Sequence, residues 1–437
     1  MSAAVLGPGA GAAHAAGAHL VKDVRPGPDG SGPSWLVGMR GVVYFEAASS
    51  IGGDGLWRSD GTAAGTRPLG GPTHGYSLTR AGDTLFFLVD GGGRRTELWR
   101  SDGTKAGTTL VRDFQAGIRY SSPDDLTNHN GVLFFTADDG SHGDELWRSD
   151  GTREGTRLER DVDPGRASSR PRWLTSVGDK LFFTARDGEH GRELWRSDGT
   201  PGGTRLVRDL HTRGKISPAW LTSFRGGLFF ASAGEGRGRE LWRSDGTAAG
   251  TRLVKDINPK KGSRPVSLTP VGRTLFLTAN DGEHGQELWR SDGTASGTRL
   301  VRDILKGDRP GGYFGPSRLS DVAGRLFFGA DDGVHGPGLW RSDGTGAGTR
   351  LLRTVDLNGP RGPVNVGGTG FFEGNDRGEF GWELWATDGT RSGTTLFRDI
   401  YPGRRNSTVG GLAAVGGTLF FSATDGVHGD ELWKATP

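Results

Sequence analysis

Short apolar runs, separated by segments rich in Gly, Asp and Pro, recur along the whole chain. In the unit that begins at Asp124, DDLTNHNGVLFFTADDGSHGDELWRSDGTREGTRLERDV, they form four segments around DLT, LFFTA, ELWRS and RLERD. Short runs rich in aromatic and β-branched residues and bounded by turn residues predict β-strands. No stretch has the periodicity of an amphipathic helix. The pattern predicts an all-β protein built from four-stranded antiparallel units.

The four-strand unit recurs nine times. Its Leu-Trp pair places tryptophans 42 to 51 residues apart, at Trp57, Trp99, Trp147, Trp195, Trp242, Trp289, Trp340, Trp385 and Trp433. A period in the forties is typical of propeller blades, whose radial packing leaves only short, protected sheet edges. We therefore predict a single closed β-propeller of nine four-stranded antiparallel blades over residues 19–437. Residues 1–18 are expected to be a disordered leader rich in Ala and Gly.

The two ends of the chain predict how the ring closes. The last unit stops at ELWKATP and lacks the strand that follows every other ELW motif, whereas HLVKDV at residues 19–24 is an unpaired copy of that strand. We predict that strand 20–24 pairs with strand 430–434 and completes the ninth blade. This register places Lys22 opposite Glu431.

The hairpin formed by the repeated ELWRSDGT phrase predicts which repeat positions are structural. Its simplest register places Trp99 opposite Leu110 and Glu97 opposite Arg112, so that both faces of the sheet are apolar. Cross-strand pairs of this kind contribute roughly 0.2–1 kcal/mol each. The Asp of SDGT, for example Asp102, is expected to accept backbone N–H bonds and hold the turn.

On these motifs the chain resembles the bacterial ELWxxDGT repeat family, and the resemblance covers residues 19–437. It implies a β-propeller-like repeat protein, often exported or surface-associated, and it implies no particular activity. The chain departs from the motif in its two GLW copies, at Gly55 and Gly338, in ATDGT at residues 386–390 and in its last copy, ELWKATP.

Composition narrows the classes of partner. The formal net charge is +3, and the arginines are spread through the repeats, which does not favour nucleic acid as a partner. No apolar run approaches the roughly 18 residues of a membrane-spanning helix. The chain has no cysteine, which excludes disulfides and thiol chemistry. We expect a monomer.

Five histidines in DGxHG loops raise the question of a metal: His142, His190, His284, His335 and His428. Each loop belongs to a different blade, so one shared zinc is implausible, and the ligand spacing of a calcium loop is absent. We predict no metal or other cofactor, with calcium in each loop as the weaker alternative. GxSxG, HExxH and phosphate-loop motifs are missing, so no catalytic residue is assigned. A convergent triad, which geometry rather than residue order defines, stays open.

One repeat position varies strongly: the residue before the Leu of each first strand. It is Trp35, Ser77, Asp125, Trp173, Trp220, Ser267, Arg318, Asn365 and Gly411 in the nine units. Strand alternation puts it on the face opposite that Leu, where it would ring the mouth of the central channel. The tryptophans either fill gaps between blades or stack on a ligand such as a sugar.

If a ligand site exists, we predict that it centres on Trp173 and Trp220, with Trp35 as a less central member. Arg172, Arg318 and Asp125 are its candidate polar residues, and Lys215 lies before Trp220.

Three functions fit these features. We expect a non-enzymatic binding or scaffold propeller that recognises a glycan or a protein partner at the mouth of the channel. The alternatives are a hydrolase or lyase with its active site in the channel, and a purely structural repeat protein. An enzyme would show clustered carboxylates or histidines with perturbed protonation at variable mouth positions, whereas a binder would show aromatic residues and arginines. The residues at the single variable position favour the binder.

Overall fold

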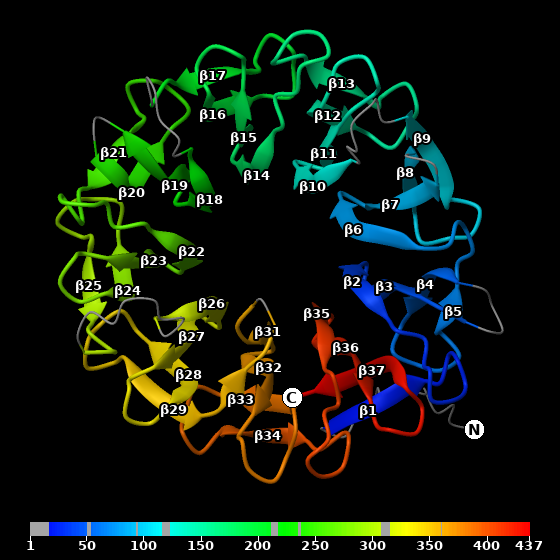
Figure 1. Ribbon diagram of the computed structural model, residues 1–437. Coiled ribbons are helices and arrows are strands. Elements are labelled where there is room, and N and C mark those ends of the chain that lie inside the picture. Colours follow the sequence, from blue (N-terminus) through cyan, green and yellow to red (C-terminus); the bar gives the residue numbers. More distant parts are fainter. Residues whose placement is uncertain are drawn as a thin grey trace, which may run out of the picture.

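The computed structural model describes residues 17–49, 54–92, 95–115, 123–210, 217–234, 237–306, 315–359 and 361–437. This part of the chain forms strands β1 to β37, in nine separate sheets arranged as a ring around an open centre (Figure 1). The predicted all-β propeller of nine blades is confirmed. None of the described residues belongs to a helix that is long and apolar enough to cross a membrane. The predicted leader lies largely outside the described residues, although Gly17 and Ala18 already belong to a strand.

In blades 1 to 8 the strands are consecutive in the chain and are given below from the centre of the ring outward, whereas blade 9 takes its outermost strand, β1, from the start of the chain (Figure 1). Blades 1 to 3 contain β2 (Ser34–Met39), β3 (Val42–Ala47), β4 (Gly55–Ser59) and β5 (Arg67–Pro68); β6 (Gly75–Ala81), β7 (Thr84–Gly92), β8 (Arg95–Ser101) and β9 (Thr109–Gln115); and β10 (Asp124–His129), β11 (Val132–Ala137), β12 (Glu145–Ser149) and β13 (Arg157–Arg160). Blades 4 to 6 contain β14 (Arg172–Val177), β15 (Lys180–Arg186), β16 (Arg192–Ser197) and β17 (Arg205–Arg208); β18 (Ala219–Phe224), β19 (Gly227–Gly234), β20 (Arg237–Ser244) and β21 (Arg252–Lys255); and β22 (Val266–Val271), β23 (Thr274–Asn280), β24 (Gln286–Ser291) and β25 (Arg299–Arg302). Blades 7 to 9 contain β26 (Ser317–Val322), β27 (Arg325–Asp331), β28 (Pro337–Ser342) and β29 (Arg350–Thr354); β30 (Asp356–Leu357), β31 (Val364–Val366), β32 (Thr369–Asn375), β33 (Glu383–Thr387) and β34 (Thr394–Arg398); and β35 (Gly410–Val415), β36 (Thr418–Thr424), β37 (Asp430–Thr436) and β1 (Gly17–Lys22).

Blade 8 differs from the others because its innermost strand is split. β30 and β31 pair with different parts of β32, which gives this sheet five strands.

The ring closes where β1 pairs with β37, so the predicted closure by the two ends of the chain is confirmed (Figure 1). The predicted register is off by one residue. A bulge after Leu20 places Lys22 opposite Leu432 instead of Glu431. The pairing also begins earlier than predicted, with Gly17 opposite Thr436.

The hydrophobic core is divided into layers, each lying between two consecutive blades. Between blades 3 and 4, Phe134 and Leu146 pack with Phe183 and Trp195, and all four side chains are buried. Nine such clusters follow one another around the ring. Each blade therefore buries apolar side chains on both of its faces.

The Asp of each SDGT turn plays the predicted structural role. In the second blade the Asp102 carboxylate accepts hydrogen bonds from the backbone nitrogen and the hydroxyl of Thr104, at 2.8 and 2.7 Å. These hydrogen bonds lower the pKa of Asp102. The carboxylate therefore stays ionised and stabilises the turn at neutral pH.

The predicted pairing of Glu97 with Arg112 across the hairpin is wrong. Trp99 does lie opposite Leu110, as predicted, but a bulge then shifts the register and places Leu98 opposite Arg112. The same shift precedes the tryptophan in the third to eighth blades. The glutamate and the cation are therefore free to make other contacts.

The glutamate carboxylate binds the connection that leads to the next blade. Glu145 is fully buried and accepts hydrogen bonds from the backbone nitrogens of Val162 and Ser169 and from the Ser169 hydroxyl, at 3.0, 2.8 and 2.6 Å. Glu240 binds Ser263 in the same way. Each such carboxylate thus fixes the path of the chain as it returns to the centre of the ring.

The Arg or Lys that was predicted to face this glutamate instead contacts the following blade. The Arg160 guanidinium donates to the carbonyl oxygen of Thr204 at 2.8 Å, and at the closing interface Lys22 donates to that of Thr66 at 2.9 Å. Equivalent bonds join Arg112 to Thr156, Arg208 to Thr251, Lys255 to Thr298 and Arg302 to Thr349. The closing interface is therefore built like the others.

The buried glutamates predict that the protein is more stable in mild acid than in mild base. Burial raises the pKa of Glu145, Glu287 and Glu383 to about 7 each, above the value of about 4.3 in an unfolded chain. A raised carboxyl pKa contributes stability that is fully present below the unfolded pKa and is lost as pH rises through the folded one. We expect the melting temperature to fall by several degrees between pH 5 and pH 8, as measured by calorimetry. Glu287→Gln should flatten this dependence, and a melting temperature that rises over the same interval would contradict the assignment.

Candidate functional site

The variable residue of the first strand has a left-handed backbone in eight of the nine blades, the exception being Asn365 of blade 8. A bulge between Asp124 and Thr127 interrupts the pairing of β10 with β11, and Asp125 within it has a φ of 54°. The same conformation, with φ between 54° and 61°, is found at Trp35, Ser77, Trp173, Trp220, Ser267, Arg318 and Gly411. It costs an L-residue roughly 1–2 kcal/mol. Simple strand alternation was therefore the wrong reason for expecting these side chains at the mouth, since a repeated bulge sets their direction.

The structure brings two of the three predicted tryptophans into contact. The rings of Trp173 and Trp220 lie 5.3 Å apart between centroids, tilted by 41°. Trp173 is 40% exposed, whereas Trp220 is partly buried against the core between blades 5 and 6. Trp35 is 51% exposed. Of these side chains, Trp220 packs most like part of the core.

A cavity of about 840 Å³ opens beside the inner strands of blades 1 to 4. Trp35, Asp125, Arg172 and Trp173 line it, so four of the six predicted site residues share one cavity. Trp220 is not among the residues that line this cavity, although its ring contacts that of Trp173. Arg318 lies in blade 7, where its Nε donates to the Gly359 carbonyl at 2.7 Å and where it lines a separate cavity of about 220 Å³. Lys215, before Trp220, lies outside the described residues.

Three further aspartates complete the acidic wall of this cavity. Asp124 begins β10, Asp138 follows β11 and Asp144 precedes β12, so antiparallel pairing brings all three to one end of blade 3. Asp138 is buried, and its carboxylate accepts a hydrogen bond from the Gly140 backbone nitrogen at 2.7 Å. We did not single out these residues for the mouth because we compared only one repeat position.

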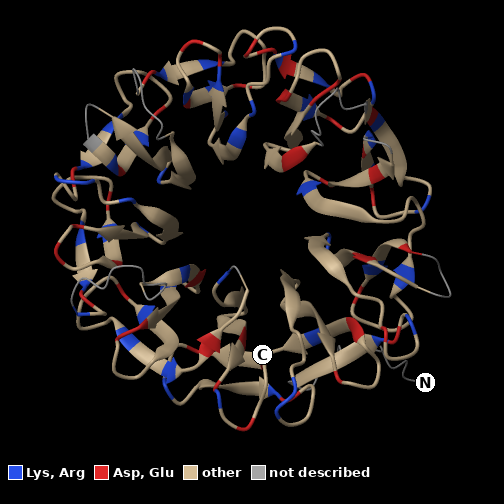
Figure 2. Ribbon diagram, viewed as in Figure 1, with Lys and Arg blue, Asp and Glu red and all other residues tan. Residues whose placement is uncertain are grey.

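Blade 4 carries arginines at the same three repeat positions. Arg172 corresponds to Asp124, Arg186 to Asp138 and Arg192 to Asp144, as the matching pairings of the two blades show. In Figure 2 the inner strand β10 accordingly carries acidic colour and the adjacent β14 carries basic colour. Comparison of the repeats at these three positions would have revealed this reversal in the sequence.

Burial and like charges perturb the protonation of this site. Desolvation, reinforced by the charges of Asp138 and Asp124, raises the pKa of Asp144 to about 6, although Arg170 and Arg172 oppose the shift. Asp125 is exposed to the cavity. Desolvation by the surrounding protein, followed by the negative charge of Asp124, nevertheless raises its pKa as well. A carboxyl group whose pKa is near 6 can exchange a proton close to neutral pH, as an acid catalyst must.

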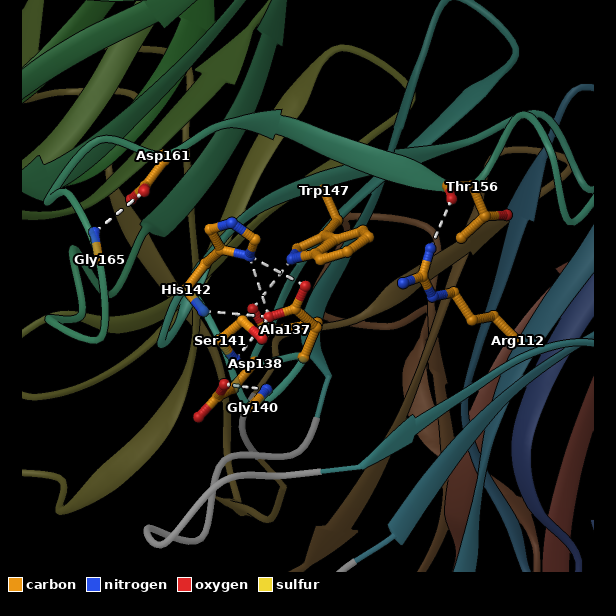
Figure 3. Close-up of polar contacts among 11 residues, drawn as sticks. Arg112, Ala137, Asp138, Gly140, Ser141, His142, Trp147, Thr156, Asp161 and Gly165 are labelled. Atoms are coloured by element: carbon orange, nitrogen blue, oxygen red, sulfur yellow. Dashed lines mark hydrogen bonds and ion pairs between the residues drawn. The ribbon is translucent and has the colours of Figure 1, made fainter.

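The DGxHG loop beside this wall is a hydrogen-bonded turn (Figure 3). In the third blade His142 Nδ1 lies 3.0 Å from the Asp139 carboxylate, which also accepts the His142 backbone N–H at 3.1 Å. The loops of His190, His284, His335 and His428 repeat this contact. Within the ranges that the structure describes, no three His, Asp or Glu side chains are placed to hold a metal ion.

No protein-family model matches the chain, and no curated protein resembles it significantly. Among solved structures, it is similar to a puromycin hydrolase (14% identity, TM-score 0.38, 78% of this chain and 58% of that chain). It is also similar to the β-propeller domain of the Trilobed protease from Pyrococcus furiosus (10% identity, TM-score 0.41, 84% and 98%) and to oligopeptidase B from Leishmania major (13%, 0.44, 80% and 52%). The chain thus spans little more than half the length of two of these enzymes. At this level of similarity their activities do not transfer to this chain.

The prediction of a non-enzymatic binding or scaffold propeller is corrected. The matched structures support the propeller fold alone. The mouth of the ring carries the clustered carboxylates and perturbed protonation that distinguish an enzyme from a binder. The aromatic residues and arginines that favoured the binder line the same cavity.

The exposure of the tryptophans predicts a division between site and core. Trp173→Ala should leave the melting temperature within a few degrees of the parent protein, because its ring is largely outside the core. Trp195→Ala should destabilise the fold by roughly 3–5 kcal/mol, because its buried ring fills the layer between blades 3 and 4. Calorimetry of the two variants checks this. If Trp173→Ala melts as early as Trp195→Ala, Trp173 is a packing residue and does not belong to a site.

Proposed function

We propose that this protein is a hydrolase that cleaves glycosidic bonds, with its active site in the cavity of about 840 Å³ beside blades 3 and 4. The observation that carries the proposal is the Asp144 carboxyl group, which lines this cavity among other aspartates and has a pKa of about 6. Glycoside hydrolysis needs such a pair of roles: one carboxyl group that donates a proton and a second that is ionised.

The raised pKa suits Asp144 to the acid role. In its protonated form, which predominates below about pH 6, it would donate its proton to the oxygen of the leaving sugar as the glycosidic bond breaks. Asp124 and Asp138 are close enough to raise its pKa, and one of them would activate the attacking water or attack the sugar directly. Bond cleavage is then completed when water adds to the anomeric carbon and a proton returns to Asp144.

The aromatic residues support a sugar as substrate. Trp35 and Trp173 are both exposed at the cavity. A flat ring in a polar recess offers an apolar face on which a pyranose can stack, while the neighbouring charges orient its hydroxyl groups. An acyl-transfer mechanism has less support, because the described cavity lining includes no histidine to activate a serine.

Membership of the ELWxxDGT repeat family, and the exported location that it implies, also remain proposals that rest on the repeated motif.

Replacement of the proposed acid should remove activity without unfolding the ring. Release of reducing ends from a panel of plant, algal and bacterial polysaccharides identifies the substrate. On it, Asp144→Asn should lower kcat by about 10²- to 10⁴-fold at an unchanged melting temperature. Asp430→Asn is the matched control, since Asp430 occupies the same repeat position in blade 9 and does not line the cavity.

The pH dependence gives the same proposal a second readout. Because the acid must be protonated, activity should decline as pH rises through about 6. This alkaline limb should shift when Arg172, which opposes the raised pKa, is replaced by Gln. An Asp144→Asn variant that retains full activity would sink the proposal.

A further inference from the structure

The charge reversal between blades 3 and 4 places unpaired cations beside the proposed acid. The side chains of Arg170 and Arg172 line the cavity, and both are exposed. Neither guanidinium makes a hydrogen bond or an ion pair with any residue in the described ranges, although the charges of both act on Asp144 and that of Arg172 also acts on Asp125. These two positive groups are therefore available to a ligand.

Backbone hydrogen bonds hold Arg170 next to the acidic wall of blade 3. Its backbone nitrogen donates to the Asp144 carbonyl at 3.0 Å. Its carbonyl accepts a hydrogen bond from Arg192 Nη1 at 2.6 Å. Arg192 itself is partly buried with Arg186, Arg172 and Arg170 as its nearest charges, and desolvation followed by these like charges lowers its pKa to about 10. Four arginines thus lie together at blade 4. The charges that act on the pKa of Arg192 are those of the other three arginines, and no acidic group offsets them.

These like charges favour the binding of an anion beside them. Guanidinium groups bind carboxylates through paired, charge-assisted hydrogen bonds, which are shorter and stronger than neutral ones. The acidic wall of blade 3 would repel an anion, so the charged group of a substrate is expected on the blade 4 side. Its neutral glycosidic oxygen is then left on the blade 3 side.

We propose that the substrate is an acidic glycan whose sugar carboxylate binds Arg170 and Arg172 while its glycosidic oxygen lies at Asp144. This inference rests on the proposed function, because it names the substrate class of the same cavity. It makes Arg170 and Arg172 specificity-determining residues and Arg192 a positioning residue that holds the Arg170 backbone.

The experiment compares polymers that differ only in charge. Polygalacturonate, alginate and hyaluronan are each paired with a carboxyl-reduced form, in which the acid group has become a neutral alcohol. Binding of the full-length Asp144→Asn protein to each polymer is measured by affinity electrophoresis at about 0.15 M salt, where non-specific attraction is largely screened. Carboxyl reduction should weaken binding about 10- to 100-fold for at least one pair, the range expected for hydrogen bonds to a charged group.

Arginine variants assign that difference to the cavity. Arg172→Gln, added to Asp144→Asn, should bind the acidic polymer about as weakly as its reduced form, with binding of the reduced form unchanged. Arg157→Gln is the control, because Arg157 is equally exposed but lies on β13 at the outside of the ring. The control should behave as the parent protein does.

The outcomes separate this inference from the proposed function. If carboxyl reduction weakens binding to none of the polymers, or if Arg172→Gln weakens binding to both members of a pair equally, the acidic-substrate inference is wrong. Cleavage by the parent protein of neutral polymers alone would also overturn it, while leaving the proposed function intact. Charge-dependent binding through Arg172 without cleavage of any bond would instead support the inference and count against the hydrolase.

Discussion

Every blade carries apolar side chains on both faces, so it is stable only when it packs between two others. This constraint demands a closed ring, and the chain meets it at the point where its ends come together. At that interface Lys22 binds the Thr66 carbonyl and Lys434 binds the Gly61 carbonyl. Arg160 makes the bond equivalent to the first between blades 3 and 4. The closing interface therefore uses the same kind of contact as the interface between blades 3 and 4, and β1 supplies the strand that the ninth blade lacks.

The same repeated contacts leave the inner ends of the strands free to differ between blades. Glutamates such as Glu145 fix the connections, and the turn aspartates fix the hairpins, so the conserved letters of each repeat are structural. The proposed active site lies where neighbouring repeats differ in sequence. Blades 3 and 4 disagree most sharply, with Asp144 in one and Arg192 in the next at the same position. A nearly symmetric scaffold thereby acquires one asymmetric, charged cavity.

The fold could be predicted closely from the sequence, because residues that recur in every repeat are those that the shared blade structure requires. The prediction was correct to the level of the Trp99–Leu110 pairing. It failed where a bulge changed the geometry: the expected Glu97–Arg112 pair does not form, and the residues near Trp173 reach the mouth through a left-handed bulge. A single variable position identified the aromatic part of the candidate site. This comparison missed Asp144, because the aspartates that lie together at one end of blade 3 come from the ends of three different strands.

A crystal structure of the Asp144→Asn protein with a bound acidic oligosaccharide tests the central claim most directly, because it locates the scissile bond and the charged group together. Our account predicts that a glycosidic oxygen lies within hydrogen-bond distance of residue 144 and that a sugar carboxylate contacts Arg170 or Arg172. It also predicts a sugar ring against Trp173. An oligosaccharide bound elsewhere on the ring, with residue 144 free of contact, would contradict it.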